Sequence, residues 1–169
     1  MVGITAFGAY VPKLRLQREA IAKANTWFDP SLAALARGER SFCNWDEDSI
    51  TMAVEAARDA TDTASRGSIE AICLASTTLP FLDRQNSGIV AEALQLNESL
   101  RTMDVTGSQR AGTTGLLSMF DAVKAGCKSA MLVASEHRRT RVGSRLEMLS
   151  GDAAAALVLG EAGVARLID

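Results

Sequence analysis

Residues 105–113 (Val-Thr-Gly-Ser-Gln-Arg-Ala-Gly-Thr) have the pattern of a turn that presents one side chain for chemistry. A strand-like run, 102–105, leads through a Gly-Ser turn into a helix rich in Ala, Gly and Thr. At such a strand-to-helix elbow the first helical amides are unpaired and partly positive, so a cysteine there would be acidified to a thiolate. The residue at this position is Gln109, whose amide forms hydrogen bonds but neither ionises nor attacks. The sequence thus predicts a catalytic type of elbow without a nucleophile.

Other residue types with chemical potential lack the partners that they would need. Ser108 and Thr113 are placed to form hydrogen bonds at the elbow, but no basic residue accompanies them, which argues against a serine nucleophile. The cysteines Cys43, Cys73 and Cys127 are odd in number, far apart and without a CxxC pair, so neither a disulfide framework nor a zinc site is indicated. No P-loop, dinucleotide-binding fingerprint or metal-ligand motif occurs. We therefore expect no metal, and a reducing cytoplasm suits the chain best.

Composition narrows the class of protein. The length of 169 residues predicts a single domain, and 47% hydrophobic residues with only 5% aromatics predict a core of Ala, Val, Leu and Ile. The net charge of −2 argues against a nucleic-acid surface. The N-terminus has no basic flank or sustained apolar run, and no stretch approaches the roughly 20 apolar residues that span a bilayer. We expect neither nucleic acid nor a membrane as partner.

Hydrophobic periodicity predicts alternating strands and helices. The predicted strands are 2–11, 69–76, 102–105, 130–135 and 153–159, with one more beginning at 164–168. The predicted helices are 17–24, one that opens at 46–48 and ends near 65–67, one around 89–94, and the elbow helix up to Gly126. Residues 25–44 are the least regular part, which we interpret as a loop with a helical piece near 32–37. This order predicts an α/β layered sheet with crossover helices.

The elbow helix begins with unusually small residues. Ala111, Gly112, Thr113, Thr114 and Gly115 offer little bulk, and each glycine weakens a helix by about 1 kcal/mol. Such a helix is useful where another backbone or a ligand comes close. We therefore expect its sides to be covered, in part by something outside these 169 residues.

Four segments in this order resemble one family. They are 8–12 (Gly-Ala-Tyr-Val-Pro), 46–56 (Asp-Glu-Asp-Ser-Ile-Thr-Met-Ala-Val-Glu-Ala), 104–113 around the elbow, and 151–156 (Gly-Asp-Ala-Ala-Ala-Ala). Together they resemble the N-terminal half of the thiolase superfamily, nearest to 3-hydroxy-3-methylglutaryl-CoA synthase and ketoacyl-ACP synthase III. The resemblance implies that 1–169 form one thiolase-like α/β half-domain, with a five-stranded mixed sheet and helices on both faces. The second half, which carries the family's catalytic His and Asn or second His, is expected to be absent from this chain.

The resemblance also shows two departures from the family pattern. Gln109 stands where the family has its acyl-accepting Cys, and Thr78 lies near the general acid/base Glu of the synthases. His137, the single histidine, belongs to the exit of the fourth strand and does not match a family catalytic His. Asp152 is interpreted as stabilising the turn before a strand.

The family's ligand implies two sets of candidate residues, with acyl-CoA as substrate or ligand and no permanently bound cofactor. The acyl-pocket candidates are Ser108, Gln109, Thr113, Thr78 and Phe81. The CoA-phosphate candidates, whose guanidinium groups suit phosphate oxygens, are Arg37, Arg40, Arg138 and Arg141.

Plainer interpretations of these residues stay open. Gln109 either borders an acyl pocket, by mimicking an acylated Cys or by bonding a substrate carbonyl, or marks an inactivated structural subunit. Phe81 either reaches across a dimer into a neighbour's acyl pocket or packs in its own loop. Each arginine alternatively serves as solvated surface charge.

Three functions follow as hypotheses. The first is a subunit of an acyl-CoA-handling complex for Claisen-type carbon–carbon bond formation or cleavage, with a second thiolase-like chain supplying the other half or the catalytic residues. The second is a non-catalytic structural or regulatory subunit that partners an active homologue. The third is an aldolase or decarboxylase that needs no Cys. The resemblance favours a hetero-oligomer, and a dimer through the strand at 102–106 is one arrangement that it implies.

Overall fold

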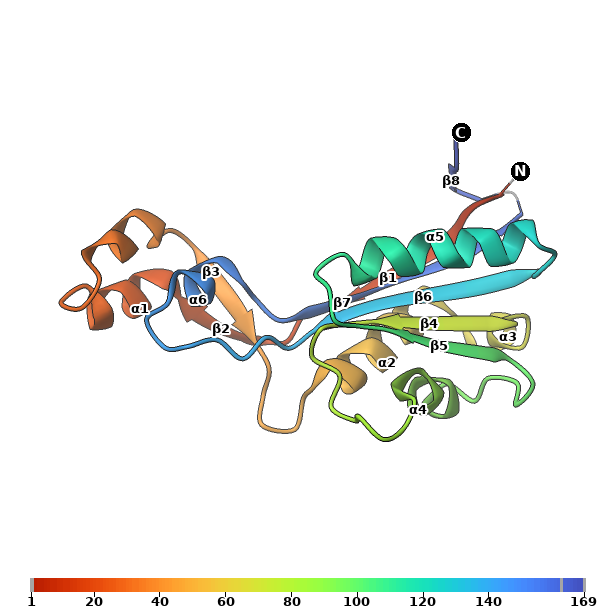
Figure 1. Cartoon of the computed structure of the whole chain (residues 1–169), viewed down its shortest axis with the longest axis horizontal. Coiled ribbons are helices and arrows are strands. Elements are labelled where there is room, and N and C mark those ends of the chain that lie inside the picture. Colours follow the sequence, from red (N-terminus) through yellow and green to blue (C-terminus); the bar gives the residue numbers. More distant parts are fainter. Residues whose placement is uncertain (1, 162, 169) are drawn as a thin grey trace.

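The computed structural model describes residues 2–161 and 163–168 and consists of a layered α/β body with a protruding lobe (Figure 1). The body is built on a mixed sheet of strand order β5-β4-β6-β7-β1-β8. β4 runs parallel to β5 and β6, whereas the β6–β7, β7–β1 and β1–β8 pairs are antiparallel. The strands are β1 (Val2–Tyr10), β4 (Ala71–Ala75), β5 (Arg101–Val105), β6 (Ser129–Glu136), β7 (Ala153–Glu161) and β8 (Ala165–Arg166).

The thiolase-like α/β prediction is confirmed, but the expected strand number was wrong, since the sheet has six strands and not five. The sixth strand, β8, is two residues long and pairs with Gly3 and Ile4 of β1. Gly3 leaves no room for a side chain here, because a Cβ on it would lie 2.2 Å from the carbonyl oxygen of Ala165. The other five strands are those that hydrophobic periodicity predicted, and β8 lies in the segment 164–168, where one more strand was predicted to begin.

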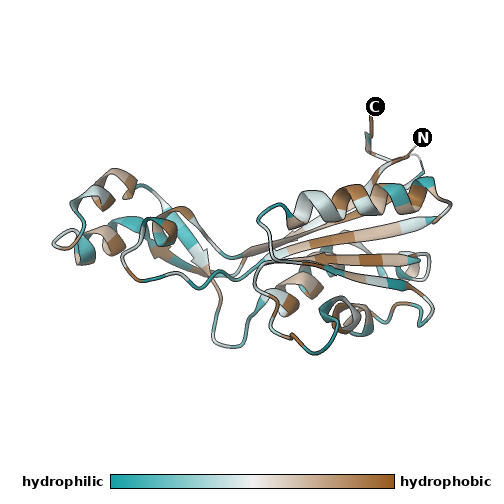
Figure 2. Ribbon diagram, in the orientation of Figure 1, coloured by the Kyte–Doolittle hydropathy of each residue, from teal (hydrophilic) through white to brown (hydrophobic). Residues whose placement is uncertain are grey.

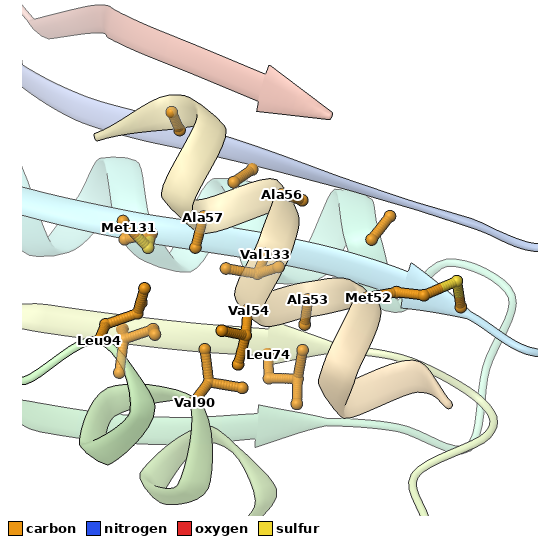
Figure 3. Close-up of a cluster of buried hydrophobic side chains, with 14 of the residues drawn as sticks. Met52, Ala53, Val54, Ala56, Ala57, Leu74, Val90, Leu94, Met131 and Val133 are labelled. Atoms are coloured by element: carbon orange, nitrogen blue, oxygen red, sulfur yellow. The ribbon is translucent and has the colours of Figure 1, made fainter. Parts of the chain in front are cut away.

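Helices cover both faces of the sheet. On one face α2 (Ser49–Ala60) and α4 (Asn86–Ala93) bury an apolar cluster with alternate strand residues such as Leu74 and Val133 (Figure 3). On the other face α5 (Ala111–Lys124) packs on the intervening residues, such as Cys73 (Figure 1). The central strands are correspondingly hydrophobic along their length (Figure 2), as expected for strands covered on both faces.

The helix predicted to run from 46–48 to 65–67 is two helices. Asp48 is the N-cap of α2 and accepts hydrogen bonds from the amides of Ile50, at 2.9 Å, and Thr51, at 2.8 Å. Thr61 leaves the helical conformation, and Asp62 caps a separate short helix, α3 (Thr63–Arg66). Polar residues with strong capping preference therefore divide the segment.

The lobe contains the segment that the sequence left irregular. It comprises β2 (Leu14–Gln17), α1 (Arg18–Asn25), the 3₁₀ helix η1 (Pro30–Leu35), β3 (Glu39–Phe42) and α6 (Arg145–Leu149). The expected helical piece is present as η1, but 39–42 form a strand paired with β2 where a loop was expected. A small core of Ile21, Ala22, Leu32 and Met148 holds the lobe together.

No described helix is long and apolar enough to cross a membrane.

Asp104 of β5 caps α4 from outside that helix. The N-cap residue Gln85 makes no side-chain cap bond, and the Asp104 carboxylate accepts instead from the amides of Asn86, at 2.7 Å, and Ser87, at 2.8 Å. Burial raises the pKa of this carboxyl, but the hydrogen bonds from Ser87 and Asn86 outweigh burial and hold the pKa below its ordinary value of 3.8. The ionised carboxylate therefore ties the edge strand to α4.

Asp104→Asn is expected to lower the free energy of unfolding by about 1–2 kcal/mol at pH 7, the usual range for a lost cap. Because the folded-state pKa is depressed, this stabilisation is present above the unfolded-state pKa and is lost as the pH falls through the folded-state pKa. Urea unfolding at pH 7 and pH 3 should show a difference between wild type and variant that shrinks at pH 3. Asp83→Asn, an exposed change, is the control, and an Asp104→Asn variant as stable as this control would contradict the capping role.

Candidate functional site

The predicted elbow is present. β5 ends at Val105, Gly107 adopts a φ of 79°, and α5 begins at Ala111. Ser108 shapes the turn, because its hydroxyl accepts from the Arg110 amide at 3.1 Å and its carbonyl accepts from the Ala111 amide at 3.0 Å. Gln109 is exposed at this turn, just before the helix. The local geometry is that of a side chain presented at a helix N-terminus.

The small residues of α5 serve close packing on the sheet. A Cβ on Gly115 would lie 2.8 Å from Cδ1 of Leu132 and 2.9 Å from Sγ of Cys73. The first turns of α5 can therefore lie directly on β4 and β6. This contact aims the helix N-terminus at the carboxyl ends of the two strands.

Glu136, at the carboxyl end of β6, brings a carboxylate to the same place. It accepts from the Thr77 amide at 2.7 Å, from the Thr77 hydroxyl at 3.0 Å and from the Thr78 hydroxyl at 3.2 Å. Arg138 donates to the Thr77 hydroxyl at 3.0 Å. Carboxylate and guanidinium thus share one hydroxyl as a partner and are held next to each other.

Gln109 and Glu136 line one small cavity of about 250 Å³ together with Arg138, Ser150 and Gly151. We refer to it as the elbow cavity. Glu136 was not among the residues that the sequence predicted for the site. A usable signal was present, because Glu136 directly follows the predicted buried strand and therefore lies at the same end of the sheet as the elbow. The elbow cavity combines an amide, a carboxylate and a guanidinium.

A larger cavity of about 680 Å³ adjoins it through Arg138. Its lining is rich in hydroxyl and cationic groups, with an apolar side. The lining residues are Asp48, Ser49, Thr77, Thr78, Leu79, Pro80, His137, Arg138, Arg139 and Leu146. We refer to it as the arginine cavity.

Of the remaining acyl-pocket candidates, Thr78 lines the arginine cavity, and the others line neither cavity. Thr113 is exposed on the first turn of α5. Thr78 lines the arginine cavity and donates to Glu136. Phe81 is 39% exposed in the loop after β4, with the Arg84 guanidinium 5.1 Å from its ring centroid. The structure thus brings Gln109 and Thr78 to the same end of the sheet, whereas Phe81 lines neither cavity.

The four arginine candidates are in different environments. Arg138 is half-buried between the two cavities. Arg40 is only 7% exposed, and its guanidinium lies 3.9 Å from Asp152 and donates to the Glu147 carbonyl at 3.3 Å. Arg37 and Arg141 are exposed and line neither cavity.

All three cysteines are free and buried. Burial, aided by the charge of Asp152, raises the pKa of the Cys43 thiol to about 12. Burial and the charge of Asp104 raise the pKa of the Cys73 thiol to about 11. These two thiols stay protonated at neutral pH and cannot replace the nucleophile that the elbow lacks.

Known proteins resemble this chain in sequence over almost its whole length. The hydroxymethylglutaryl-CoA synthase of Archaeoglobus fulgidus is 32% identical over 173 residues, which cover 99% of this chain and 50% of the relative. That of Pyrococcus horikoshii is 32% identical over 95% of this chain and 45% of the relative. No protein-family model matches. The chain spans about half the length of these curated relatives.

Solved structures share the fold. MvaS in complex with 3-hydroxy-3-methylglutaryl coenzyme A superposes with a TM-score of 0.81 at 26% identity, covering 95% of this chain and 40% of that one. The 3-oxoacyl-(acyl carrier protein) synthase III, FabH, from Pseudomonas aeruginosa gives a TM-score of 0.80 at 25% identity, covering 95% of this chain and 50% of that one.

The elbow helix laid on a mixed sheet, together with these matches, places the chain in the thiolase superfamily. Within it, the chain corresponds to the N-terminal half: the relatives named above are hydroxymethylglutaryl-CoA synthases, and the similar folds include a synthase III enzyme.

Proposed function

We propose that residues 1–169 form one half of a site that acts on acyl-CoA thioesters in Claisen-type carbon–carbon bond formation or cleavage. The observation that carries this proposal is the elbow cavity, which gathers Gln109, Glu136 and Arg138 at the carboxyl edge of parallel strands. Hydroxymethylglutaryl-CoA synthases among the relatives, and the MvaS complex among the similar folds, support the ligand class. No cofactor needs to be bound permanently for this chemistry.

In the proposed site Gln109 lines the acyl pocket in place of a nucleophile. Its amide N–H donates to the thioester carbonyl oxygen, and the Arg138 guanidinium stabilises negative charge that develops on that oxygen. Glu136 is the carboxylate that can take or return a proton. A covalent acyl-enzyme at the elbow is not part of the mechanism, since Gln109 cannot form one.

The arginine cavity is the proposed place for the CoA phosphates. Arg139 offers a guanidinium group there, and Ser49, Thr77 and Thr78 add hydroxyl groups, while Arg138 serves the thioester oxygen at the border with the elbow cavity. Arg37 and Arg141, which line neither cavity, remain candidates for binding the CoA phosphates from the periphery. Arg40 acts on phosphate binding only indirectly, by helping to position the lobe.

A second thiolase-like chain is the proposed partner, which supplies the other half and the catalytic His and Asn. α5 leaves apolar side chains exposed on and beside its face of the sheet: Phe7 of β1 is 68% exposed, and Leu117 of α5 is 56% exposed. Apolar side chains in such positions mark an interaction surface. The edge strand β5 offers a second contact, although Gln85 already donates to the Thr102 carbonyl at 2.9 Å. Such a hetero-oligomer would work in the reducing cytoplasm, which suits the free cysteines.

Gln109→Ala is expected to lower the turnover of the native complex about a hundredfold, the typical loss when one donor to a developing oxyanion is removed. The complex is isolated from its source through a tagged copy of this chain, its subunits are identified by mass spectrometry, and condensation and cleavage are assayed with a panel of acyl-CoAs. Gln17→Ala, the same change on the lobe, is the control and should leave turnover unchanged. Gln109→Cys tests whether the elbow still supports covalent acylation.

Unchanged turnover in Gln109→Ala would favour the second candidate, a non-catalytic subunit. The observation on that side is that Gln109 has no nucleophilic chemistry and that all three thiols are buried elsewhere. A partner with its own complete Cys, His and Asn set would point the same way. Activity on an aldol or a β-keto acid, without acyl transfer, would instead indicate the aldolase or decarboxylase alternative.

A further inference from the structure

The lobe joins the body through a narrow neck at which chain segments far apart in the sequence meet (Figure 1). Residues 11–13 lead from β1 to β2, 43–48 lead from β3 to α2, 137–144 lead from β6 towards α6, and 150–152 lead back to β7. Three of these four connections each contribute one residue to a cluster of Cys43, His137 and Asp152.

The donor atoms of the cluster converge. One donor atom from each residue, the thiol sulfur, an imidazole nitrogen and a carboxylate oxygen, lies within 4.8 Å of the others. His137 Nδ1 is 3.2 Å from Asp152 Oδ2. Two ligands on a tetrahedral zinc ion, each about 2.0–2.1 Å from the metal, are about 3.3 Å apart, so this pair already has the spacing that zinc requires. A Zn–S bond is about 2.3 Å long, so the Cys43 sulfur, which lies within 4.8 Å of the other two donor atoms, has to move towards them to complete the set.

The two oxygens of the Asp152 carboxylate have different partners. Oδ1 accepts from the Arg138 amide at 3.2 Å and faces the Arg40 guanidinium at 3.9 Å. Oδ2 faces His137 and accepts from the Cys43 amide at 2.9 Å. The guanidinium charge therefore sits on the opposite oxygen from the proposed metal position.

The surroundings suit a cation. Asp152 is 2% exposed and Cys43 is 9% exposed, so the donors are held away from competing water. Glu47 and Asp48 lie close enough to act electrostatically on Cys43, which adds negative potential. His137 lines the arginine cavity, which gives the fourth coordination position access to solvent.

We propose that Cys43, His137 and Asp152 form a zinc site that fastens the lobe to the body. The three donors are the side-chain types that zinc prefers, and three protein ligands with water as the fourth ligand is the coordination that catalytic zinc sites use. Binding displaces the Cys43 thiol proton to solvent, as in other cysteinyl zinc sites. The sequence gives no sign of the site because its ligands do not share a short motif.

The proposal is tested by measuring the metal content of the tag-free chain. The chain is purified in its native complex and dialysed first against zinc and then against metal-free buffer. We expect one equivalent of zinc in this chain, and with Co²⁺ as probe a thiolate-to-cobalt charge-transfer band. Cys43→Ser and His137→Gln should each lower retained zinc at least tenfold and abolish that band. Cys127→Ser, a change at another buried thiol outside the neck, is the control and should leave both unchanged.

Two results would overturn the proposal. One is zinc well below one equivalent in the wild type. The other is a variant that keeps its zinc and its cobalt band. Circular dichroism of each variant separates lost metal from lost fold, and His137→Gln keeps the test usable if Cys43→Ser does not fold, because the His137 side chain is 28% exposed. Zinc should also raise the Tm of the wild type and of Cys127→Ser, but not that of His137→Gln.

Discussion

Replacing Asp152 by asparagine is expected to lower the free energy of unfolding by about 3–5 kcal/mol, the usual result of removing one partner of a buried ion pair. The Arg40 guanidinium, 7% exposed, would then keep its charge without the ion-pair partner that residues 2–161 and 163–168 provide. The same carboxylate accepts from the amides of Cys43 and Arg138, which lie on two different connections of the neck. Its loss therefore weakens the lobe and the body together.

Urea unfolding at pH 7 in the presence of EDTA measures this effect without a contribution from bound metal. Asp83→Asn removes the same charge at an exposed position and should change the stability by less than about 0.5 kcal/mol. If Asp152→Asn lost no more than this control, the carboxylate would not hold the neck.

Replacing Gly8 by alanine is expected to cost about 3 kcal/mol, at the upper end of the usual range for overpacking. A Cβ at this position would lie 2.3 Å from the Ala60 amide nitrogen and 2.6 Å from the Ala56 carbonyl oxygen. Both are backbone atoms of α2, so no rotamer change relieves the clash, and the helix has to move away from β1.

Gly88→Ala in α4 is the matched control, because a Cβ there meets no atom within 4 Å. It should stabilise the protein by about 0.5–1 kcal/mol, since glycine is unfavourable inside a helix. Thermal and urea unfolding of the two variants should therefore shift in opposite directions, and equal shifts would show that α2 does not approach β1 this closely.

Local patterns were enough to predict the body of the molecule. The strands around Ile72 and Met131 are short apolar runs, and the elbow before Ala111 carries a glycine turn and a small-residue helix. These signals depend only on residues that are close in the sequence, so they can be recognised without knowledge of the tertiary structure. The short strand β8 is at the limit of such signals, because its pairing with Gly3 and Ile4 is a tertiary contact.

The lobe and the candidate sites depend on contacts between distant segments. Residues 39–42 form a strand because β2 pairs with them, not because their own pattern demands it. Glu136 meets Gln109 only after β5 and β6 have taken their places on either side of β4. Cys43 and Asp152 likewise become neighbours through the fold alone.

The connections of the neck have a topological consequence. Glu136 and Ala153, the residues that flank one excursion into the lobe, are already paired across β6 and β7, and β1 is paired with β7 along its length. The hydrogen bonding of the sheet is thus complete without the lobe, which makes the lobe a module inserted at two points. Such a module can be exchanged or reshaped during evolution while the elbow and its supporting strands keep their geometry.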